Sequence, residues 1–459
     1  MQSASLPFRY IVYVLLALWL KPAIGFASTN TYTDFEQSIF ESPFVKLDEI
    51  TGTVIGQGFT DQALLKNSVY GLLELKKTLN DTELEIGLAF DSIDNQPKIN
   101  TLSYTHYFDD YEIKIGKFVS KIGVLDFFSC IDVLNTTRIQ YYDEENINLR
   151  QRPSLLGQFN YFLDENSTLN FIVAPYDDNR RDYVNQSIGL SLNIGVPYYL
   201  LNSGNSTIDL IAKPILLPVY NQGAKQAVSK YIDNKLPKNH IELDTTTFAM
   251  NYTTYQNQST FGAVYINGYS NIPIIKLDPD LIAAVENLND EDAVNYIDTY
   301  LQKDENEPIK SIQYNRYNQI AVYTETAIQS YGLRAELSYR DQFPIINDVT
   351  EQLSLGLGID HKGEIYNNLE LQYFYLPNKS IKAYYAIWQM RFDSFYIGKW
   401  KTQIENTSSL ATYENNQLYG MLPSINFNYK NLNISLKYLM HSKQELVENT
   451  AILSVKAVF

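Results

Sequence analysis

Apolar and polar residues alternate at every second position in many separate stretches of this chain. The clearest stretches lie at residues 68–77, 83–91, 111–116, 331–340, 353–360 and 432–440. Alternation with a period of two is typical of a β-strand whose two faces meet different surroundings. The pattern therefore predicts an all-β protein built from many amphipathic strands.

The polar faces of these stretches carry charges of both signs, such as Arg334 and Glu336. A soluble β-sandwich has little reason to keep paired charges on the second face of so many strands, whereas a water-filled lumen explains them. We therefore expect a transmembrane antiparallel β-barrel whose apolar face meets lipid. The residues expected to line its lumen are Glu83, Glu85, Lys114, Arg334, Glu336, Arg391 and Asp393.

Short and long connections alternate along the chain, as they do in outer-membrane barrels. The short ones are expected at 79–81, 109–110, 164–166, 202–205, 256–258, 329–330, 361–363 and 430–431. The long ones are expected at 60–68, 92–98, 119–153, 177–183, 219–242, 270–312, 341–350 and 442–449. This division predicts about 20 strands, with a range of 16 to 20.

Two of the long connections have helical spacing of apolar residues. One helical stretch is Pro279 to Lys303, which has an acidic opposite face, and the other is Tyr220 to Lys235. An apolar stripe has to be buried, so these helices are expected to lean over or into the barrel mouth. The alternative is a small local core with a solvated charged face.

The N-terminus is typical of a secretory signal peptide over Met1 to Ala27, because Arg9 precedes an apolar run and Gly25-Phe26-Ala27 follows it. The run of about 11 residues is too short for a membrane helix, which needs about 20. We expect residues 28–49 to form a periplasmic segment and 50–459 to form the barrel, with insertions at 119–153, 219–242 and 270–312.

Composition narrows the possible functions. The chain has 37 Tyr and 22 Phe, which suits strands and interfacial girdles. Cys130 is the single cysteine, so no intramolecular disulfide can form, and the four His residues have no metal spacing. The net charge of −16 becomes −18 once Arg9 and Lys21 leave with the signal peptide, which argues against a nucleic-acid partner. No cofactor or metal is expected.

The last ten residues alternate again and end on an aromatic residue, Phe459. This end resembles the last strand of bacterial outer-membrane barrels, where a terminal Phe serves as a signal to the barrel assembly machinery. We expect this strand to pair with the first strand near residues 50–59. Leu453 and Val455 should then face the bilayer, and Ser454 and Lys456 the lumen.

The most distinctive stretch runs from Gly116 to Pro153. Its marked residues are Gly123, Asp126, Asp132, Asn135, Arg138, Arg150 and Arg152. With the Leu-Arg-x-Glu strand at 333–336, it resembles a family of Gram-negative outer-membrane barrels of largely unassigned function, of the porin-like and alginate-export-like type. The chain departs from that pattern at Ile122, where Trp is usual, and at 136–138, which replaces a Pro-containing end.

A structural role for this loop is favoured over direct contact with a substrate. Asp132 and Asn135 are suited to capping turns of a loop that folds inward. Arg138, Arg150 and Arg152 could hydrogen-bond the loop to the barrel wall.

These observations favour a porin-like channel in the bacterial outer membrane that passes small polar solutes. The alternatives are an outer-membrane transporter for hydrophobic compounds and a surface adhesin or structural barrel. The chain contains no nucleophile-elbow pattern, so an enzyme is not expected. His106 is the best candidate for a general base, although a lone His on a strand is more often a girdle or pore-lining residue.

Overall fold

The structure is a computed structural model that describes most of the chain. The described residues are 48–59, 67–92, 96–127, 129–132, 134–137, 151–175, 205–216, 243–270, 274–303, 306–413, 416–441 and 450–458. The predicted signal peptide, the helix predicted at 220–235, and Arg138, Arg150 and Phe459 lie outside these ranges.

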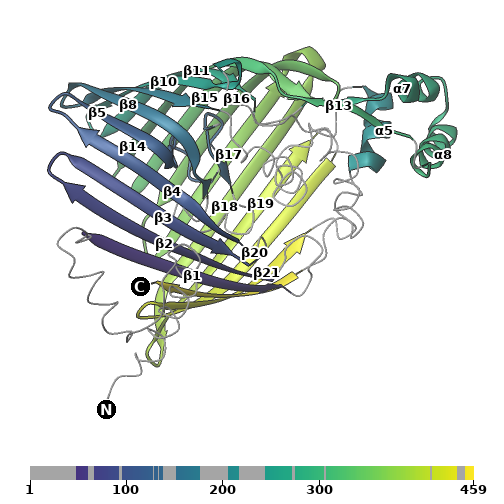
Figure 1. Ribbon diagram of the computed structural model, residues 1–459. Coiled ribbons are helices and arrows are strands. Elements are labelled where there is room, and N and C mark those ends of the chain that lie inside the picture. Colours follow the sequence, from purple (N-terminus) through teal and green to yellow (C-terminus); the bar gives the residue numbers. More distant parts are fainter. Residues whose placement is uncertain are drawn as a thin grey trace, which may run out of the picture.

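Eighteen described strands form one closed antiparallel barrel (Figure 1). They are β1 (Glu49–Phe59), β2 (Ser68–Leu79), β3 (Thr82–Asp91), β4 (Gln96–Tyr107), β5 (Tyr111–Phe118), β8 (Ser154–Asp164), β9 (Ser167–Ala174), β10 (Thr247–Gln256), β11 (Ser259–Tyr269), β14 (Arg316–Ile328), β15 (Tyr331–Ile345), β16 (Asp348–His361), β17 (Ile365–Leu376), β18 (Ile381–Ile397), β19 (Trp400–Tyr413), β20 (Asn416–Tyr429), β21 (Leu432–His441) and β22 (Thr450–Val458). Each strand pairs with the next one in chain order. The barrel closes where β1 pairs with β22, from Thr53 opposite Val458 to Phe59 opposite Ile452. The predicted closure by the last strand is therefore confirmed, and the barrel leaves no strand edge open.

The strand number lies within the predicted range of 16 to 20 but is two below the expected 20. The difference lies between β9 and β10, which pair directly with each other. Of the turn predicted at 202–205, only Asn205 lies in the described part. Asn205 precedes helix α5 (Ser206–Leu216) and caps its first turn, because its side chain accepts a hydrogen bond from Thr207 N at 3.0 Å.

The alternating apolar and polar positions of the strands form the outer and the inner face of the barrel. On β16, Leu353, Leu355, Leu357 and Ile359 are exposed on the outside, whereas Ser354 between them is buried. The last strand follows the same rule, with Leu453 and Val455 exposed and Ser454 buried. Aromatic rings gather where the short turns lie, as in the contacts Tyr331–His361 at 4.6 Å and Trp400–Tyr429 at 5.4 Å between ring centroids. An apolar outer face with aromatic residues at its border is typical of a membrane barrel.

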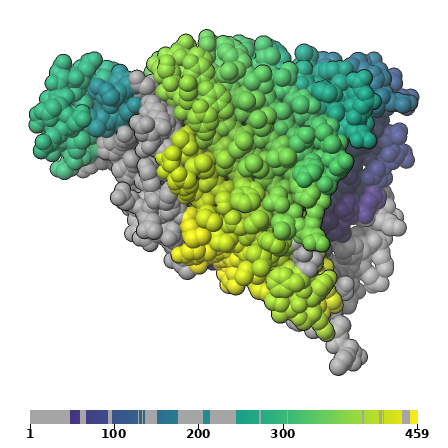
Figure 2. Space-filling model, turned by 180° about the vertical axis from the view of Figure 1, so that it is seen from behind, coloured from purple at the N-terminus to yellow at the C-terminus, as the bar shows by residue number. Residues whose placement is uncertain are grey.

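A small lobe projects beyond the rim of the barrel rather than into its mouth (Figures 1 and 2). It consists of β12 (Ile274–Leu277), β13 (Ile309–Gln313), α7 (Pro279–Val285), α8 (Asp290–Leu301) and α5. The helical spacing at 279–303 is thereby confirmed, but the expected position over or in the mouth is wrong. The apolar stripe of α7 and α8 is buried in a local core with α5, β12 and β13, including Leu281, Ile297 and Ile309.

The remaining described elements are short. The strands β6 (Thr136–Thr137) and β7 (Gln151–Arg152) pair with each other, and the 3₁₀ turns are η4 (Leu243–Thr245) and η5 (Pro377–Lys379). Among the residues that the structure describes, no helix combines the length and the apolar character needed to cross a membrane.

Candidate functional site: a loop anchored inside the barrel

The connection after β5 turns into the barrel and lies against its inner wall. We call the described residues of 119–135 the inward loop. Its underside is apolar, because Ile122, Ile131 and Leu134 are buried against inner-face residues of β8, β9, β11 and β14 such as Ile172 and Ile266. Removal of this apolar surface from water favours the docked position of the loop.

Glu336 on β15 is the main polar anchor of the inward loop. Its Oε1 accepts hydrogen bonds from Val124 N at 2.6 Å and Leu125 N at 3.0 Å. Its Oε2 accepts from Ser129 Oγ at 2.8 Å, Cys130 N at 2.9 Å and Cys130 Sγ at 3.4 Å. The side chain is 1% exposed. A buried carboxylate is tolerated only when hydrogen bonds replace its lost water, and here the loop supplies them.

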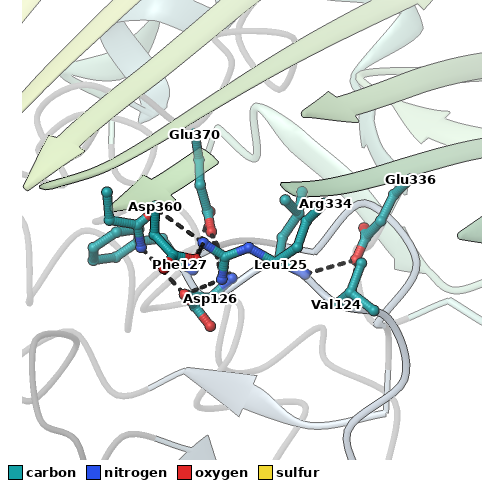
Figure 3. Close-up of polar contacts among 9 residues, drawn as sticks. Val124, Leu125, Asp126, Phe127, Arg334, Glu336, Asp360 and Glu370 are labelled. Atoms are coloured by element: carbon teal, nitrogen blue, oxygen red, sulfur yellow. Dashed lines mark hydrogen bonds and ion pairs between the residues drawn. The ribbon is translucent and has the colours of Figure 1, made fainter. Parts of the chain in front are cut away.

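Glu370 on β17 holds the next part of the loop in the same way. It accepts hydrogen bonds from Asp126 N at 2.6 Å and Phe127 N at 3.1 Å. Figure 3 shows both carboxylates directed at the loop backbone from the wall. Five backbone N–H groups of the loop are thus bound by two inner-face acids.

Arg334 lies between these acids and pairs with several groups. Its guanidinium donates to Asp126 of the loop and to Asn368 Oδ1 at 3.0 Å, and it lies 3.2 Å from Asp360 Oδ2 and 3.9 Å from Glu370 Oε1 (Figure 3). The side chain of Arg334 is almost fully buried, whereas that of Asp126 is 45% exposed. Asp126 therefore reaches the remaining bore, while Arg334 lies beneath the loop.

Glycines make the close approach of loop and wall possible. Gly123 has φ of +99°, and a Cβ there would lie 2.5 Å from Glu336 Oε1. On β16, a Cβ at Gly356 would lie 2.5 Å from Leu125 Cδ1. Only glycine meets both demands at Gly123, a left-handed backbone and contact with the anchor.

Asp132 and Asn135 shape the end of the loop. Asp132 Oδ1 accepts a hydrogen bond from Leu134 N at 3.2 Å, which is an Asx turn of the predicted kind. Asn135 Oδ1 accepts from Ser120 N at 3.0 Å, and its Nδ2 donates to Arg152 O at 3.1 Å. The structure thus joins both ends of the loop through Asn135. Arg152 takes part through its backbone carbonyl and its pairing in β7.

Burial perturbs two titratable groups of the loop. It raises the pKa of Asp132 to about 7. It also raises the pKa of the Cys130 thiol, and the neighbouring Glu336 carboxylate adds to this effect. The thiol therefore stays protonated and acts as a weak hydrogen-bond donor to Glu336.

The other residues expected in the lumen lie on β3, β5 and β18. Glu83 pairs with Lys76 at 2.8 Å, and Glu85 pairs with Lys114 at 2.9 Å and accepts from Ser103 Oγ at 2.9 Å. The guanidinium of Arg391 lies 5.0 Å from the centre of the Tyr366 ring. Asp393 lies where the register of β18 shifts, between Phe392 and Phe395, and its side chain is outside the described part.

His106 is placed on the outer face of β4. It lies among aromatic rings, 6.5 Å from Tyr104 and 4.2 Å from Phe108 between centroids. In the sheet register its neighbours Thr105 and Ser103 are the residues that point inward. In the described part of the chain, no group of three or more His, Cys, Asp or Glu side chains is placed to hold a metal ion.

Sequence reasoning missed several wall residues that touch the loop or its anchors. Among them are Gln319, Asp360, Asn368 and Glu370. Gln319 Nε2, for example, donates to Cys130 O at 3.2 Å. Each occupies a polar position in an alternating strand, so the period of two marked it as inward-facing. Nothing in the sequence of its own strand, however, indicates that the residue contacts a loop.

The comparisons with known proteins give remote structural likenesses only. No family model matches the chain, and no curated protein matches it. OccK5 (OpdH) of Pseudomonas aeruginosa is 9% identical with a TM-score of 0.46, covering 89% of this chain and 96% of that one. The outer membrane channel DcaP of Acinetobacter baumannii is 10% identical with a TM-score of 0.41, covering 90% and 96%. The anion-selective porin of Comamonas acidovorans is 8% identical with a TM-score of 0.40, covering 90% and 99%.

Proposed function

We propose that this protein is a channel of the bacterial outer membrane that passes small polar solutes passively through its barrel. The closed ladder of 18 strands pairs the backbone hydrogen-bonding groups of the strands without water. The outer face presents rows of exposed apolar side chains. Closed barrels and helices are the two structures that can span lipid for this reason. The inner face is polar, so water and polar solutes are its natural contents.

The observation that carries the proposal is the inward loop fixed by Glu336 and Glu370. A loop that is anchored in this way narrows the bore, and it does not move freely enough to close it. It presents the half-exposed Asp126 and the exposed Lys121 toward the space that remains. Solutes would therefore meet a constriction of defined shape, where side chains act at short range.

The charged side chains that we propose to line the lumen fall into two groups with different roles. Glu83, Glu85, Lys114 and Arg391 would face passing solutes and create a field of mixed sign. Arg334 and Glu336 would hold the constriction in place instead, since the loop covers them. We further propose that residues 1–27 direct export and that Phe459 assists assembly of the barrel.

Single-channel recording tests the proposal. The purified full chain, reconstituted in a planar lipid bilayer, should give discrete ohmic current steps in potassium chloride. Protein that inserts and migrates as a heat-modifiable barrel but gives no current steps would refute a polar channel. That result would favour the alternatives of a hydrophobic-compound transporter or a surface adhesin.

A further inference from the structure

The outer face of the barrel carries two polar residues where the positions beside them are apolar. Asn406 and Ser408 lie on β19, and Asn406 Nδ2 donates a hydrogen bond to Ser408 Oγ at 2.8 Å. In the sheet register Asn406 is opposite Met390 of β18, and Ser408 is opposite Trp388, whose side chain is 44% exposed. Both residues therefore point outward, away from the bore. We call Asn406 and Ser408 the outer polar pair.

In an inserted barrel, the outer polar pair lies well inside the band that lipid covers. Asn406 is six positions after Trp400, which belongs to the aromatic border near the short turns. Six residues at about 3.3 Å each, on a strand tilted by about 40°, rise about 15 Å along the barrel axis. The apolar band of such a barrel is about 25 Å tall, so the pair lies near its middle. Hydrocarbon chains at this depth offer no hydrogen-bond donors or acceptors.

The outer polar pair does not satisfy its own hydrogen-bonding groups. Asn406 Oδ1 is buried and has no hydrogen-bond partner among the described residues. The amide also has a second N–H, and the Ser408 hydroxyl keeps its own hydrogen when its oxygen accepts from Asn406. A polar group without a partner is unfavourable in an apolar medium, because nothing there replaces its lost bonds to water. A partner that supplies hydrogen bonds would therefore stabilise this part of the outer face.

The strand beside the outer polar pair is interrupted at the same place. Pro423 of β20 is opposite Asn406, and it has no N–H to donate to the ladder. The pairing of β20 with β21 skips positions 422 and 423 and resumes at Ser424. Proline is uncommon in a strand that is paired on both sides. The unsatisfied amide and the interrupted ladder thus mark one place on the outer face.

Large apolar side chains surround the outer polar pair. Trp388, Ile404, Met421 and Ile425 lie on the same face of β18, β19 and β20, and each is 40% to 44% exposed. Within membranes, proteins associate through close packing and through polar side chains that hydrogen-bond across the contact. A small polar centre with apolar side chains around it provides both.

We infer that the outer polar pair is the centre of a two-fold contact between two copies of this chain in the membrane. The pair carries both donors and acceptors, so its partial charges are complementary to those of the same pair in a copy turned by 180°. The χ2 torsion of asparagine is soft, so the Asn406 amide can turn its oxygen outward to accept a bond from the second copy. This contact requires the outer-membrane position of the proposed channel, but it does not require the passage of solutes.

Sedimentation equilibrium of the purified full chain in density-matched detergent micelles measures the association. The wild type should form a dimer in equilibrium with the monomer. Asn406→Leu removes two hydrogen bonds from a two-fold contact and should raise the dissociation constant about tenfold, because such bonds are of modest strength within membranes. Ser408→Ala is a second variant and should act in the same direction. Thr324→Val is the matched control, because Thr324 lies on the outer face of β14, opposite the exposed Phe261. It should leave the dissociation constant unaltered.

Cysteine cross-linking locates the contact in cell membranes. Met421→Cys places a thiol opposite Ser408 in the sheet register, and a short bismaleimide should then join two chains. Met250→Cys is the matched control, because Met250 on the outer face of β10 is 42% exposed and Met421 is 44% exposed. It should give no cross-linked dimer. The wild type serves as the blank, because its Cys130 lies in the inward loop inside the barrel.

The possible failures can be told apart. A wild type that inserts as a heat-modifiable barrel but stays monomeric would overturn the two-fold contact, and so would a dimer that both Asn406→Leu and Ser408→Ala leave unaltered. A cross-link from Met421→Cys to a different membrane protein would overturn it too, because the contact would not join two copies. A dimer that carries no ion current would overturn the proposed channel and leave the contact intact.

Discussion

The replacement Glu336→Gln probes the anchor of the inward loop most directly. Glutamine has nearly the same shape, but one carboxylate oxygen becomes an NH₂ group that can only donate. If it takes the place of Oε1, it faces the N–H groups of Val124 and Leu125. If it takes the place of Oε2, it faces Ser129 and Cys130. Either orientation leaves at least two donors without an acceptor.

The size of the effect follows from these bonds. A hydrogen bond to a charged group contributes about 1.5 to 3 kcal/mol, and a buried donor left unpaired costs about the same. Two such losses give about 3 to 6 kcal/mol, and we take the lower figure because neighbouring effects do not add. At about 1.4 kcal/mol for each factor of ten, the equilibrium between docked and undocked loop shifts by more than about a hundredfold.

Two measurements report on loop docking. In single-channel recordings, Glu336→Gln should show frequent steps between the wild-type current and larger currents, because the loop leaves the bore. In proteoliposomes, trypsin should cut after Lys121, which lies on the loop and is shielded by the barrel while the loop is docked. Glu364→Gln, an exposed acid in the turn between β16 and β17, is the matched control and should behave as wild type.

A steady current of wild-type size together with wild-type resistance to trypsin would refute this account. It would mean that the apolar underside alone holds the loop, and that the bonds to Glu336 contribute less than about 1 kcal/mol.

Four further predictions concern the loop, the outer face and the last residue. Gly356→Val should push Leu125 off the wall and raise current noise as Glu336→Gln does, while Gly356→Ala should have a smaller effect. Burial raises the pKa of Asp132 from 3.8 to about 7, so docking should weaken as pH rises from about 4 to about 7; current noise should follow this in the wild type and not in Asp132→Asn. Leu337→Arg on the outer face should lower barrel stability by about 2 to 4 kcal/mol in a lipid refolding titration, and equal midpoints would contradict a lipid-facing position. Removal of Phe459 should lower the yield of heat-modifiable barrel in cells before it alters the current of the barrels that form.

The parts of the fold that depend on local pattern could be predicted from the sequence. The period of two placed Leu355 outside and Glu336 inside, because a strand's faces are fixed by the strand itself. The helical period at 279–303 likewise identified α7 and α8. The helical pattern does not indicate which elements an amphipathic helix packs against. We therefore expected these helices over or in the barrel mouth, whereas they are buried in a core that β12 and β13 supply beside them.

The candidate site was harder to predict because its contacts join distant parts of the chain. Glu336 binds Val124, which is 212 positions earlier, and Glu370 binds Asp126, which is 244 positions earlier. An inward-facing acidic residue lies in the same alternating local sequence whether its side chain faces water or binds a loop. Gly123 and Asp126 could be singled out as a motif, but only the closed barrel brings their partners to them.

The way in which Glu336 and Glu370 hold the inward loop bears on how such a channel can change over generations. Both acids bind main-chain N–H groups, which every residue except proline provides in the same place. These main-chain hydrogen bonds therefore do not depend on which side chains the loop carries, whereas the packing of Leu125 on Gly356 and the pairing of Asp126 with Arg334 do. Point mutations can thus vary the chemistry of the loop's exposed side chains while the main-chain frame that holds the loop stays unaltered.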